Sequence, residues 1–319
     1  MMPARAFVLG AGLGTRLKPL TDGRPKPLVP IYGKPLITFA FDHLIASGVT
    51  GFVVNTHHCP EAYPAILGGS GETLDYAGCE VRLRHEPILL DTGGGIRNVA
   101  DLIGREDFVV YNGDVLADFP LAPAFEWHAR SGNLATLVLR SSGGPLQISM
   151  SNETGLITNF RDRLPGTSDP AFLFTGISIL SPEIFPHIPE GGILSIISTY
   201  TSLILDGARI GGFIVDSGAW FDLGSINAYL DAHSWLASHH LSYTPASWHV
   251  PVDRTADVDP EASLAGFNAV CPGARIGRDA TLTDCVVWEN ARIAPHSELV
   301  RCIVRDGREA SGSRVEAVI

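Results

Sequence analysis

Several signals that would assign a chain to a common protein class are weak or missing in this sequence. Positive charge is scarce, with 23 Lys and Arg against 34 Asp and Glu and a net charge of -11, which argues against a nucleic-acid-binding protein with a basic face. Only five cysteines occur, and because none stands in a C-x-x-C pair or at histidine spacing, no metal or redox motif is indicated. No run approaches the ~20 apolar residues of a membrane-spanning helix, and the apolar stretch at residues 6–13 is too short for a signal peptide. We therefore expect a soluble, cytoplasmic protein with free thiols that binds neither nucleic acid nor membranes.

The first half of the chain alternates short apolar runs with amphipathic stretches. Two amphipathic stretches are predicted to be helices: residues 35–47, ended by Gly48, and residues 93–103, with Thr92 as the N-cap. Strands that alternate with helices predict an α/β fold with a Rossmann-like, mixed but mainly parallel sheet, whose ligands bind at the carboxyl ends of the strands. The apolar runs predicted to form its buried strands are residues 6–9, 52–55, 81–85, 108–111 and 135–140.

The pattern changes after residue 143. Short strand-like pieces with turn signals fill residues 143–178 and predict an antiparallel extension beside the main sheet. Helices are predicted around residues 193–205 and 225–238. Residues 241–256 show no sustained period and are interpreted as a linker that follows a domain of residues 1–240.

A repeat with a period of six occupies the C-terminal part of the chain. A large aliphatic residue recurs, each time two positions after a smaller residue, and the register shifts once by a single residue. This hexapeptide pattern predicts a short left-handed parallel β-helix over residues 257–319, in which the large residue points inward and the small one fits the corner. Strands of a β-sandwich are the alternative. The large residues are Leu264, Val270, Ile276, Leu282, Val287, Ile293 and Leu299, and the smaller ones are Ala262, Asn268, Ala274, Ala280, Cys285, Ala291 and Ser297.

A glycine-rich loop follows the first predicted strand. It reads GAGLGTRL from Gly10 to Leu17, with Pro-Lys-Pro at residues 25–27. A dinucleotide-binding loop requires glycine three positions after Gly12, where Thr15 stands, and the Walker A pattern is absent. The loop therefore predicts phosphate binding of another kind, next to an unusual density of cations.

This loop and five later segments resemble the signature of sugar-1-phosphate nucleotidyltransferases, also called NDP-sugar pyrophosphorylases. The segments are EPILLDTGGGI, YNGDV, FTGISIL and WFDLGS, preceded by GAGLGTRLKPLT and RPKPLVPIYGKPLI, and they occur in the family's order over about the first 240 residues. The Asp-Thr-Gly form is most similar to mannose-1-phosphate guanylyltransferase-like and N-acetylmuramate-1-phosphate uridylyltransferase-like members. Members of the superfamily often carry a hexapeptide tail.

The resemblance implies an enzyme that joins a nucleoside triphosphate (NTP) to a sugar 1-phosphate, giving an NDP-sugar and pyrophosphate with the help of Mg2+. The sugar is expected to be a hexose or an N-acetylated hexose derivative. The second pKa of a phosphate monoester lies near 6, so the attacking phosphate is already largely a dianion at neutral pH and requires no general base. The task is then to neutralise charge as two anions approach each other.

The resemblance also assigns the catalytic residues. Arg16 is expected at the β- and γ-phosphates and Lys26 near the α-phosphate, while Asp114 and Asp222 are the expected magnesium ligands. Lys18 and Arg24 have no such support and are expected to be surface charges.

Two substrate pockets follow from the same motifs. This sequence has Asp91 where the family most often has Gly, and it has Arg161-Asp162-Arg163 where many members have the Glu-Lys pair that binds the sugar phosphate. Arg differs from Lys in reach and geometry.

The nucleotide-binding candidates are Leu9, Ala11, Gly12, Gly14, Thr15, Glu86, Thr92 and Gly93, and the candidates for binding the sugar phosphate are Asn112, Asp162, Arg163, Thr175 and Gly176.

Other functions remain open at this point. The chain could be a non-catalytic regulatory paralogue that binds nucleotide or NDP-sugar, although the phosphate cations and metal carboxylates are intact. Acetyl transfer in the β-helix has His296 as its single candidate base, so a role in stability or homo-oligomer assembly is preferred for this part. The sequence selects neither the base nor the sugar.

Overall fold

A computed structural model describes residues 2–160, 163–164, 170–245, 248 and 250–319. The chain divides into two compact units. The first comprises the residues up to Leu13 together with Ile37–Phe221, and the second comprises Gly14–Leu36 and Asp222–Ile319. The glycine-rich loop is therefore split, and the part that carries the cations belongs with the C-terminal part of the chain.

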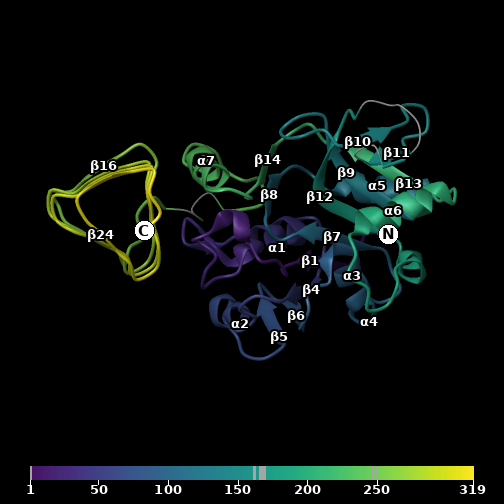
Figure 1. Cartoon of the computed structure of the whole chain (residues 1–319), viewed down its shortest axis with the longest axis horizontal. Helices are drawn as coiled ribbons and strands as arrows, with labels where there is room; N and C mark the ends of the chain where they lie inside the picture. Colours follow the sequence, from purple (N-terminus) through teal and green to yellow (C-terminus); the bar gives the residue numbers. More distant parts are fainter. Residues whose placement is uncertain (1, 161–162, 165–169, 246–247, 249) are drawn as a thin grey trace. The chain divides into compact units, whose positions relative to one another are not determined.

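The first unit is built on an eight-stranded sheet of order β13-β9-β12-β7-β1-β4-β6-β5 (Figure 1). The neighbouring strands are parallel, except that β12 and β5 run antiparallel to theirs. All five predicted strands are confirmed. The bounds are β1 (Arg5–Leu9), β4 (Gly51–Thr56), β5 (Thr73–Tyr76), β6 (Cys79–His85), β7 (Phe108–Asn112), β9 (Ala135–Arg140), β12 (Leu173–Leu180) and β13 (Ile210–Ile214).

Helices pack against this sheet because the middle residues of its central strands are apolar. One core joins Phe7, Val53 and Val110 of the sheet with Ile96 and Tyr200 of two helices, all at most 4% exposed. Each such side chain contributes about 1.5–3 kcal/mol when it is removed from water. The helices are α1 (Ile37–Ala46), α2 (Ala62–Leu67), α3 (Asp91–Asn98), α4 (Ala100–Ile103), α5 (Ala122–Ser131) and α6 (Ile196–Leu205), with the 3-10 helix η3 (Pro182–His187).

The predicted helix over residues 93–103 differs from the structure in two ways. It is divided at Val99 into α3 and α4. The predicted cap is wrong, because α3 begins at Asp91 with Leu90 at the N-cap position and Thr92 lies inside the first turn. The hydroxyl of Thr92 instead accepts a hydrogen bond from the backbone N–H of Ile196, at 2.9 Å.

The antiparallel extension predicted for residues 143–178 is confirmed in part. Strands β10 (Ile148–Met150) and β11 (Ile157–Phe160) form a separate antiparallel pair. The last piece, β12, belongs to the main sheet instead, where it pairs with β7 and β9, and seven of its eight residues are buried because both faces of the strand are covered. A further short pair consists of β8 (Val115–Asp118) and β14 (Ala219–Asp222).

The second unit begins with the segment Gly14–Leu36, which we call the cation loop. It contains two short 3-10 helices, η1 (Thr15–Leu17) and η2 (Lys26–Leu28), and the hairpin β2 (Pro30–Ile31) and β3 (Lys34–Pro35). The predicted helix at residues 225–238 is α7 (Ile226–Leu236).

Three parallel sheets follow, and they surround one apolar core in the triangular yellow segment of Figure 1. Paired residues lie 17 or 18 positions apart along most of the segment, which is one coil of a parallel β-helix. These parallel sheets fit the expected short β-helix, and the small residues Ala274, Ala280 and Ala291 are all fully buried. The parallel pairing also contradicts a β-sandwich, whose sheets are antiparallel. The sheets are β15 (Asp257–Val258), β18 (Arg275–Ile276), β21 (Arg292–Ile293), β24 (Glu309–Ala310); β16 (Ser263–Ala265), β19 (Thr281–Thr283), β22 (Glu298–Val300), β25 (Ser313–Val315); and β17 (Ala269–Val270), β20 (Val286–Val287), β23 (Ile303–Val304).

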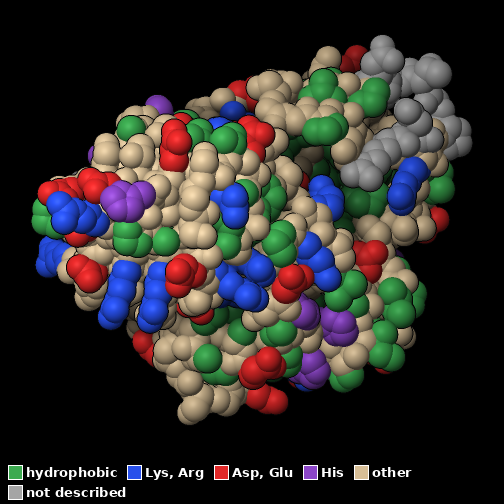
Figure 2. All heavy atoms as spheres, turned by 60° about the vertical axis from the view of Figure 1, so that its left-hand side comes forward, with side chains coloured by type: hydrophobic (Ala, Val, Ile, Leu, Met, Phe, Trp, Pro, Cys, Tyr) green, Lys and Arg blue, Asp and Glu red, His purple; other side chains and the backbone are tan. Residues whose placement is uncertain are grey.

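The cysteines form no disulfide bond, and the face of the molecule drawn in the space-filling view carries charges of both signs. All five cysteines are free. In the space-filling view, Lys and Arg side chains lie beside Asp and Glu side chains and do not gather into one basic surface (Figure 2). Within the part of the chain that the structure describes, no helix has the length and apolar character that crossing a membrane requires. The domain boundaries expected near residues 240 and 257 stay a prediction, because a compact unit is not evidence of where an independently folding part begins.

Candidate active site

Three of the expected catalytic residues come together within the second unit. Lys26 is 8% exposed, and its Nζ atom lies 3.6 Å from Oδ1 of Asp222. A Cβ atom added to Gly224 would come within 3.1 Å of Nη2 of Arg16 and within 3.2 Å of Oδ1 of Asp222. The side chain of Asp222 stays 45% exposed. Arg16, Lys26 and Asp222 thus form a cluster of two cations and one accessible carboxylate, which we call the cation cluster.

The local structure of the cation loop holds the cations in place. Gly14 adopts the left-handed conformation (φ 58°), and its carbonyl accepts a hydrogen bond from the hydroxyl of Thr21 at 2.9 Å. A side chain at Gly14 would lie 2.9 Å from Cγ2 of Thr21 and 3.2 Å from Cβ of Lys26. Both the backbone conformation and the space therefore require glycine here. Thr15 starts η1, whose Leu17 is fully buried and anchors the turn.

Gly12 stands in a different situation from Gly14. Its φ is not in the left-handed region, and no described atom lies within 4 Å of the position that its Cβ would take. Nothing in the described part of the fold therefore demands glycine at residue 12. Open space beside a glycine is the situation in which a ligand can approach the backbone closely.

In the first unit, a buried amide and a buried carboxylate shape the carboxyl edge of the sheet. Oδ1 of Asn55 accepts hydrogen bonds from the backbone N–H groups of Gly10 and Ala11, at 2.8 and 3.1 Å. Its Nδ2 donates to Oε1 of Glu86 at 2.8 Å, while Oε2 of Glu86 accepts from the N–H of Leu90 at 3.1 Å. Asn55 and Glu86 are each 1% exposed. The network fixes the loop after β1 to the segment before α3.

No sequence motif pointed to Asn55. The carboxylate of Glu86, a nucleotide-binding candidate, is hydrogen-bonded within the protein. A polar residue at the end of the apolar run VVNT was the available signal for Asn55. Both carboxylate oxygens of Glu86 bind protein groups. Its expected contact with the nucleotide stays a prediction.

The glycines of DTGGGI are required by internal packing. The N–H of Gly93 donates to the carbonyl of Leu194 at 2.8 Å, and a Cβ on Gly94 would lie 2.3 Å from the carbonyl oxygen of Gly192. A Cβ on Gly95 would lie 3.0 Å from Nδ2 of Asn55. The glycines thus admit neighbouring segments of this chain, and the nucleotide contacts expected of Thr92 and Gly93 stay a prediction.

Asp91 explains one departure from the common family form. Its φ is 59°, in the left-handed region that glycine adopts freely and that Asp tolerates. Its Oδ1 accepts a hydrogen bond from the N–H of Thr92 at 2.6 Å, which stabilises this conformation locally. The position therefore demands a backbone conformation, and Gly and Asp are two ways to meet it.

Asp114 lies in the turn between β7 and β8 and is partly buried. The preceding Gly113 donates its N–H to the carbonyl of Leu9, at the end of β1, at 3.0 Å. A Cβ on Gly113 would lie 2.6 Å from that carbonyl, so the Gly-Asp pair is fixed against β1. Leu9 and Asp114 are thereby held at the carboxyl edge of the sheet, where ligands of α/β proteins bind.

Asn112 and Gly176, two of the candidates for binding the sugar phosphate, lie next to each other. Gly176 has φ 81° at an irregularity in β12, and a Cβ there would lie 2.6 Å from Nδ2 of Asn112. Thr175 is fully buried and its hydroxyl donates to the carbonyl of Val138, at 2.8 Å. The structure thus gives the hydroxyl of Thr175 a partner inside the fold, and a sugar contact from it stays a prediction.

WFDLGS connects the two units of the chain by way of a strand and a helix cap. Nε1 of Trp220 donates to the carbonyl of Thr175 at 2.9 Å, and Ser225 caps α7 by accepting from the N–H of Ala228 at 3.2 Å. Upstream, the N–H and hydroxyl of Ser141 donate to Asp216 at 2.8 and 2.7 Å and lower the pKa of its carboxyl group. Within its own unit, Asp222 is therefore followed closely by the capped start of α7.

Arg163 and Asp162 are the remaining candidates for binding the sugar phosphate. Arg163 is exposed, and its N–H donates to the carbonyl of Phe160 at 3.0 Å. Asp162 lies outside the described residues. In the described ranges, no three His, Cys, Asp or Glu side chains form a group that could hold a metal ion by themselves.

Comparison with known proteins decides the family. A family model described as "Nucleotidyl transferase" matches residues 5–239. The chain belongs to the nucleotidyl transferase family. Its relatives include the mannose-1-phosphate guanylyltransferase of Mycobacterium tuberculosis (strain ATCC 25618 / H37Rv), 30% identical over 90% of this chain and 80% of that protein. The N-acetylmuramate alpha-1-phosphate uridylyltransferase of Caulobacter vibrioides is 32% identical over 74% of this chain and 98% of that protein. These relatives place the chain among enzymes of the sugar-1-phosphate nucleotidyltransferase type.

A solved structure supports the fold of the nucleotidyl transferase part. A putative glucose-1-phosphate thymidylyltransferase from Bacillus anthracis, in complex with a sucrose, superposes with a TM-score of 0.62 and 22% identity. The match covers 74% of this chain and 96% of that one. The mixed α/β fold expected from the sequence is thereby confirmed.

Proposed function

We propose that this nucleotidyl transferase uses the cation cluster to transfer a nucleotidyl group from an NTP to a hexose 1-phosphate or an N-acetylated hexose 1-phosphate. The observation that carries the proposal is the meeting of Arg16, Lys26 and Asp222 around Gly224. Two cations next to an accessible carboxylate suit a triphosphate that must be held, neutralised and approached by a second anion.

The proposed reaction is a single in-line displacement. An oxygen of the sugar phosphate forms a bond to the α-phosphorus, the bond from the α-phosphorus to its bridging oxygen breaks, and the electron pair leaves with pyrophosphate. Because the attacking phosphate has a second pKa near 6, no protein base has to remove a proton at neutral pH. Arg16 stabilises the charge on the leaving pyrophosphate, and Lys26 stabilises the charge at the α-phosphate.

The carboxylates fit a magnesium ion in character. Asp222 is 45% exposed and Asp114 is partly buried, and both offer the hard oxygen ligands that Mg2+ prefers. When bound, the ion would neutralise phosphate oxygens, with water and substrate completing its coordination. We propose Asp114 and Asp222 as its protein ligands.

The test is release of pyrophosphate from purified full-length protein incubated with Mg2+, each NTP and a panel of sugar 1-phosphates. The relatives supply the first pairs: GTP with mannose 1-phosphate and UTP with N-acetylmuramate 1-phosphate. The first has priority, because that relative matches 90% of this chain, so the match extends beyond the nucleotidyl transferase part. Folded protein with no turnover for any pair would contradict the proposal.

A regulatory paralogue that binds nucleotide without turnover is the alternative. It is distinguished by Asp114→Asn, measured beside the unaltered protein. An enzyme should lose about two orders of magnitude in rate with this change. A binding protein should show no turnover in either form, while an NDP-sugar raises the melting temperature of the unaltered protein.

We further propose a homo-oligomer formed through the β-helix, in a chain organised as residues 1–240, a linker and residues 257–319. The parallel sheet of β16, β19, β22 and β25 ends at Val315, which is 66% exposed. Light scattering of the full chain measures the mass, and Val315→Asp should lower it. An unaltered monomeric mass would contradict this assembly.

A further inference from the structure

The prediction that Arg24 is a surface charge is wrong. The side chain of Arg24 is only 16% exposed. Its Nη1 lies 3.4 Å from Oε2 of Glu289 and its Nη2 lies 3.9 Å from Oδ2 of Asp306. The guanidinium carbon lies 5.1 Å from the centroid of the Trp288 ring. Arg24 of the cation loop is thus held by two successive coils of the β-helix.

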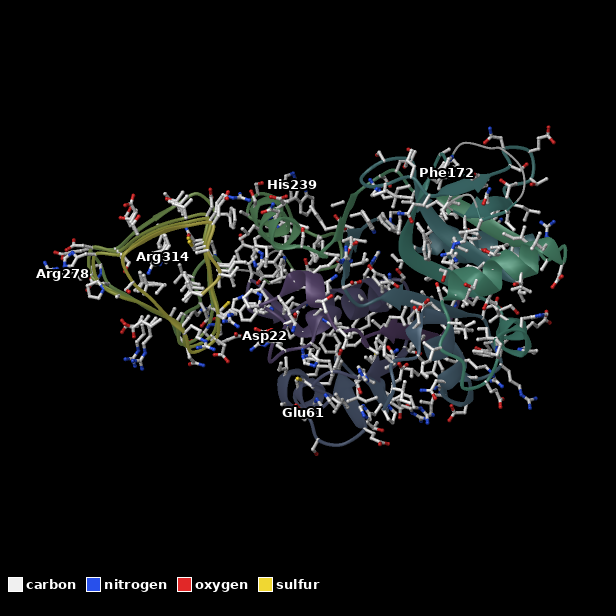
Figure 3. The ribbon with its side chains drawn as sticks, in the orientation of Figure 1. Asp22, Glu61, Phe172, His239, Arg278 and Arg314 are labelled. Carbon is white, nitrogen blue, oxygen red and sulfur yellow. The ribbon has the colours of Figure 1, made fainter. Side chains whose placement is uncertain are left out.

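A second arginine makes the reciprocal contact. Arg305 of the β-helix donates from Nη1 to the carbonyl of Pro19 at 3.0 Å and lies 3.8 Å from Asp22. Figure 3 labels Asp22 beside the yellow β-helix ribbon. Lys18, by contrast, is 58% exposed, as the sequence predicted, and its contact is a salt bridge to Asp22.

A buried aromatic contact fixes the far end of the cation loop. Nε1 of Trp288 donates to the hydroxyl of Tyr229 at 3.0 Å, and this hydroxyl donates in turn to the carbonyl of Pro30. Trp288 is 2% exposed and Tyr229 is fully buried. Burial raises the pKa of Tyr229 well above its ordinary value, so the hydroxyl keeps the proton that it donates. The β-helix therefore contacts the cation loop directly before Lys26 and is linked to it after Lys26 through Tyr229 of α7.

We propose that Arg24 and Arg305 are positioning residues, through which the β-helix keeps Arg16 and Lys26 in the geometry that nucleotidyl transfer needs. This inference rests on the proposed function of the cation cluster. Arg24 lies two residues before Lys26, and Pro19 lies three residues after Arg16. Backbone hydrogen bonds within the loop, from Leu20 to Leu17 and from Val29 to Lys26, connect the contacts to the cations.

The magnitudes favour positioning over stability as the role of these contacts. Ion pairs near a protein surface contribute about 0–1 kcal/mol, and a cation over a ring shielded from water, as Trp288 is, about 2 kcal/mol. Such energies are modest beside a free energy of unfolding of about 5–15 kcal/mol, but the geometry that they fix matters more, since a displacement of about 1 Å at a reacting centre can cost about a hundredfold in rate. A part of the chain that lacks catalytic residues can therefore control the rate.

The experiment compares Arg24→Gln and Glu289→Gln, which remove the ion pair from its two sides, with the double variant. Arg278→Gln is the matched control: Arg278 lies on a β-helix corner, is 63% exposed and pairs with Glu261 of the same β-helix. We expect kcat to fall by about tenfold in each loop variant, with the double variant no worse than the single ones. KM for the sugar phosphate and the urea midpoint should change little, and Arg278→Gln should behave as the unaltered enzyme.

Hydrogen exchange supplies a readout that does not depend on turnover. The amides of Leu17, Leu20 and Val29 should exchange faster in Arg24→Gln and Glu289→Gln than in Arg278→Gln. If the unaltered protein shows no turnover, the proposed function fails while exchange still decides whether the β-helix holds the loop. Unchanged exchange and a kcat within about twofold of the unaltered enzyme would overturn the positioning role. Asp306→Asn provides a further variant if either substitution prevents folding.

Discussion

The ammonium group of Lys26 lies 3.6 Å from a carboxylate oxygen of Asp222, although the two residues belong to opposite ends of the nucleotidyl transferase sequence. Their contact places the proposed phosphate-binding cation beside the proposed metal ligand. Because Asp222 is 45% exposed, the pair is accessible to solvent and can accept a further charged group.

Asp222→Asn keeps the size of the side chain and removes its charge. We expect kcat to fall by about two orders of magnitude, since the change weakens charge neutralisation in the transition state. The Mg2+ concentration for half-maximal rate should rise, as measured by titrating the metal in the pyrophosphate assay. Asp231→Asn is the matched control, because Asp231 is an exposed acid of the same unit that pairs with Arg301. Equal Mg2+ dependence in both variants would contradict a metal-binding role for Asp222.

Gly12 and Gly14 should respond in opposite ways to substitution by alanine. Gly12→Ala meets no described atom, so the free energy of unfolding should change by less than about 0.5 kcal/mol. Its turnover should nevertheless fall by about tenfold or more if phosphates approach the backbone there. Gly14→Ala should lower the free energy of unfolding by about 1–3 kcal/mol, because its φ is 58° and Thr21 lies close. Urea unfolding and steady-state rates measure the two effects, and full activity of Gly12→Ala would argue against close approach of the nucleotide.

Asp91 is held in a left-handed conformation at an exposed position, so its substitution tests the backbone and not the packing. Asp91→Gly should stay within about 1 kcal/mol of the unaltered protein, because relief of the backbone offsets the lost hydrogen bond to Thr92. Asp91→Val should cost about 2 kcal/mol, since a β-branched residue strongly disfavours this conformation. Glu126→Val, at an exposed helical position, is the control and should cost only a few tenths. Equal stability of the three variants would refute the conformational explanation.

Two buried histidines predict a stability that falls in mild acid. Burial lowers the pKa of both His43 and His233 to about 4. His43 contacts Tyr111 and the carbonyl of Phe119, with Asp118 nearby, while His233 contacts Tyr32 and the carbonyl of Tyr229. Their side chains are therefore neutral in the folded protein, whereas an unfolded histidine protonates near pH 6.5.

The sign follows from the protons that each state binds. Below pH 6.5 the unfolded chain takes up protons that the folded chain does not, so the free energy of unfolding decreases as pH falls toward 4. Each histidine should cost about 2 kcal/mol between pH 6.5 and pH 5. Urea midpoints at pH 7.5 and pH 5 measure the loss, and His233→Gln should make the two midpoints closer. The exposed control His296→Gln should leave the difference unchanged. A midpoint that does not move with pH would contradict neutral burial of these rings.

The regular parts of this protein were readable from local pattern. Strands β1, β4, β6, β7 and β9 and the coils of the β-helix follow from apolar runs and a six-residue period, because side chains alternate in and out of a sheet or prism at fixed spacing. The residues at which helices begin depend on tertiary contacts as well as on local composition. Thr92 has the composition of a cap, but its hydroxyl accepts a hydrogen bond from Ile196, a partner far along the chain.

The motifs identified the candidate side chains of the site but not all of the residues that hold the neighbouring backbone in place. Asn55 holds the backbone of Gly10 and Ala11, yet as one polar residue after an apolar strand it carries no distinctive pattern. The glycines of DTGGGI pointed to a ligand, whereas the structure places Gly192 and Leu194 against them. A glycine shows that something approaches the backbone, and only the tertiary structure identifies what does.

The sequence by itself determined the family, the α/β sheet and the β-helix, and it predicted the set Arg16, Lys26, Asp114 and Asp222, because each depends on local spacing or on an ordered series of motifs. The tertiary structure alone decided that Arg24 and Arg305 join the cation loop to the β-helix. Their partners lie hundreds of residues away, and a charge on a loop looks the same in sequence whether it faces water or an acid from a distant coil.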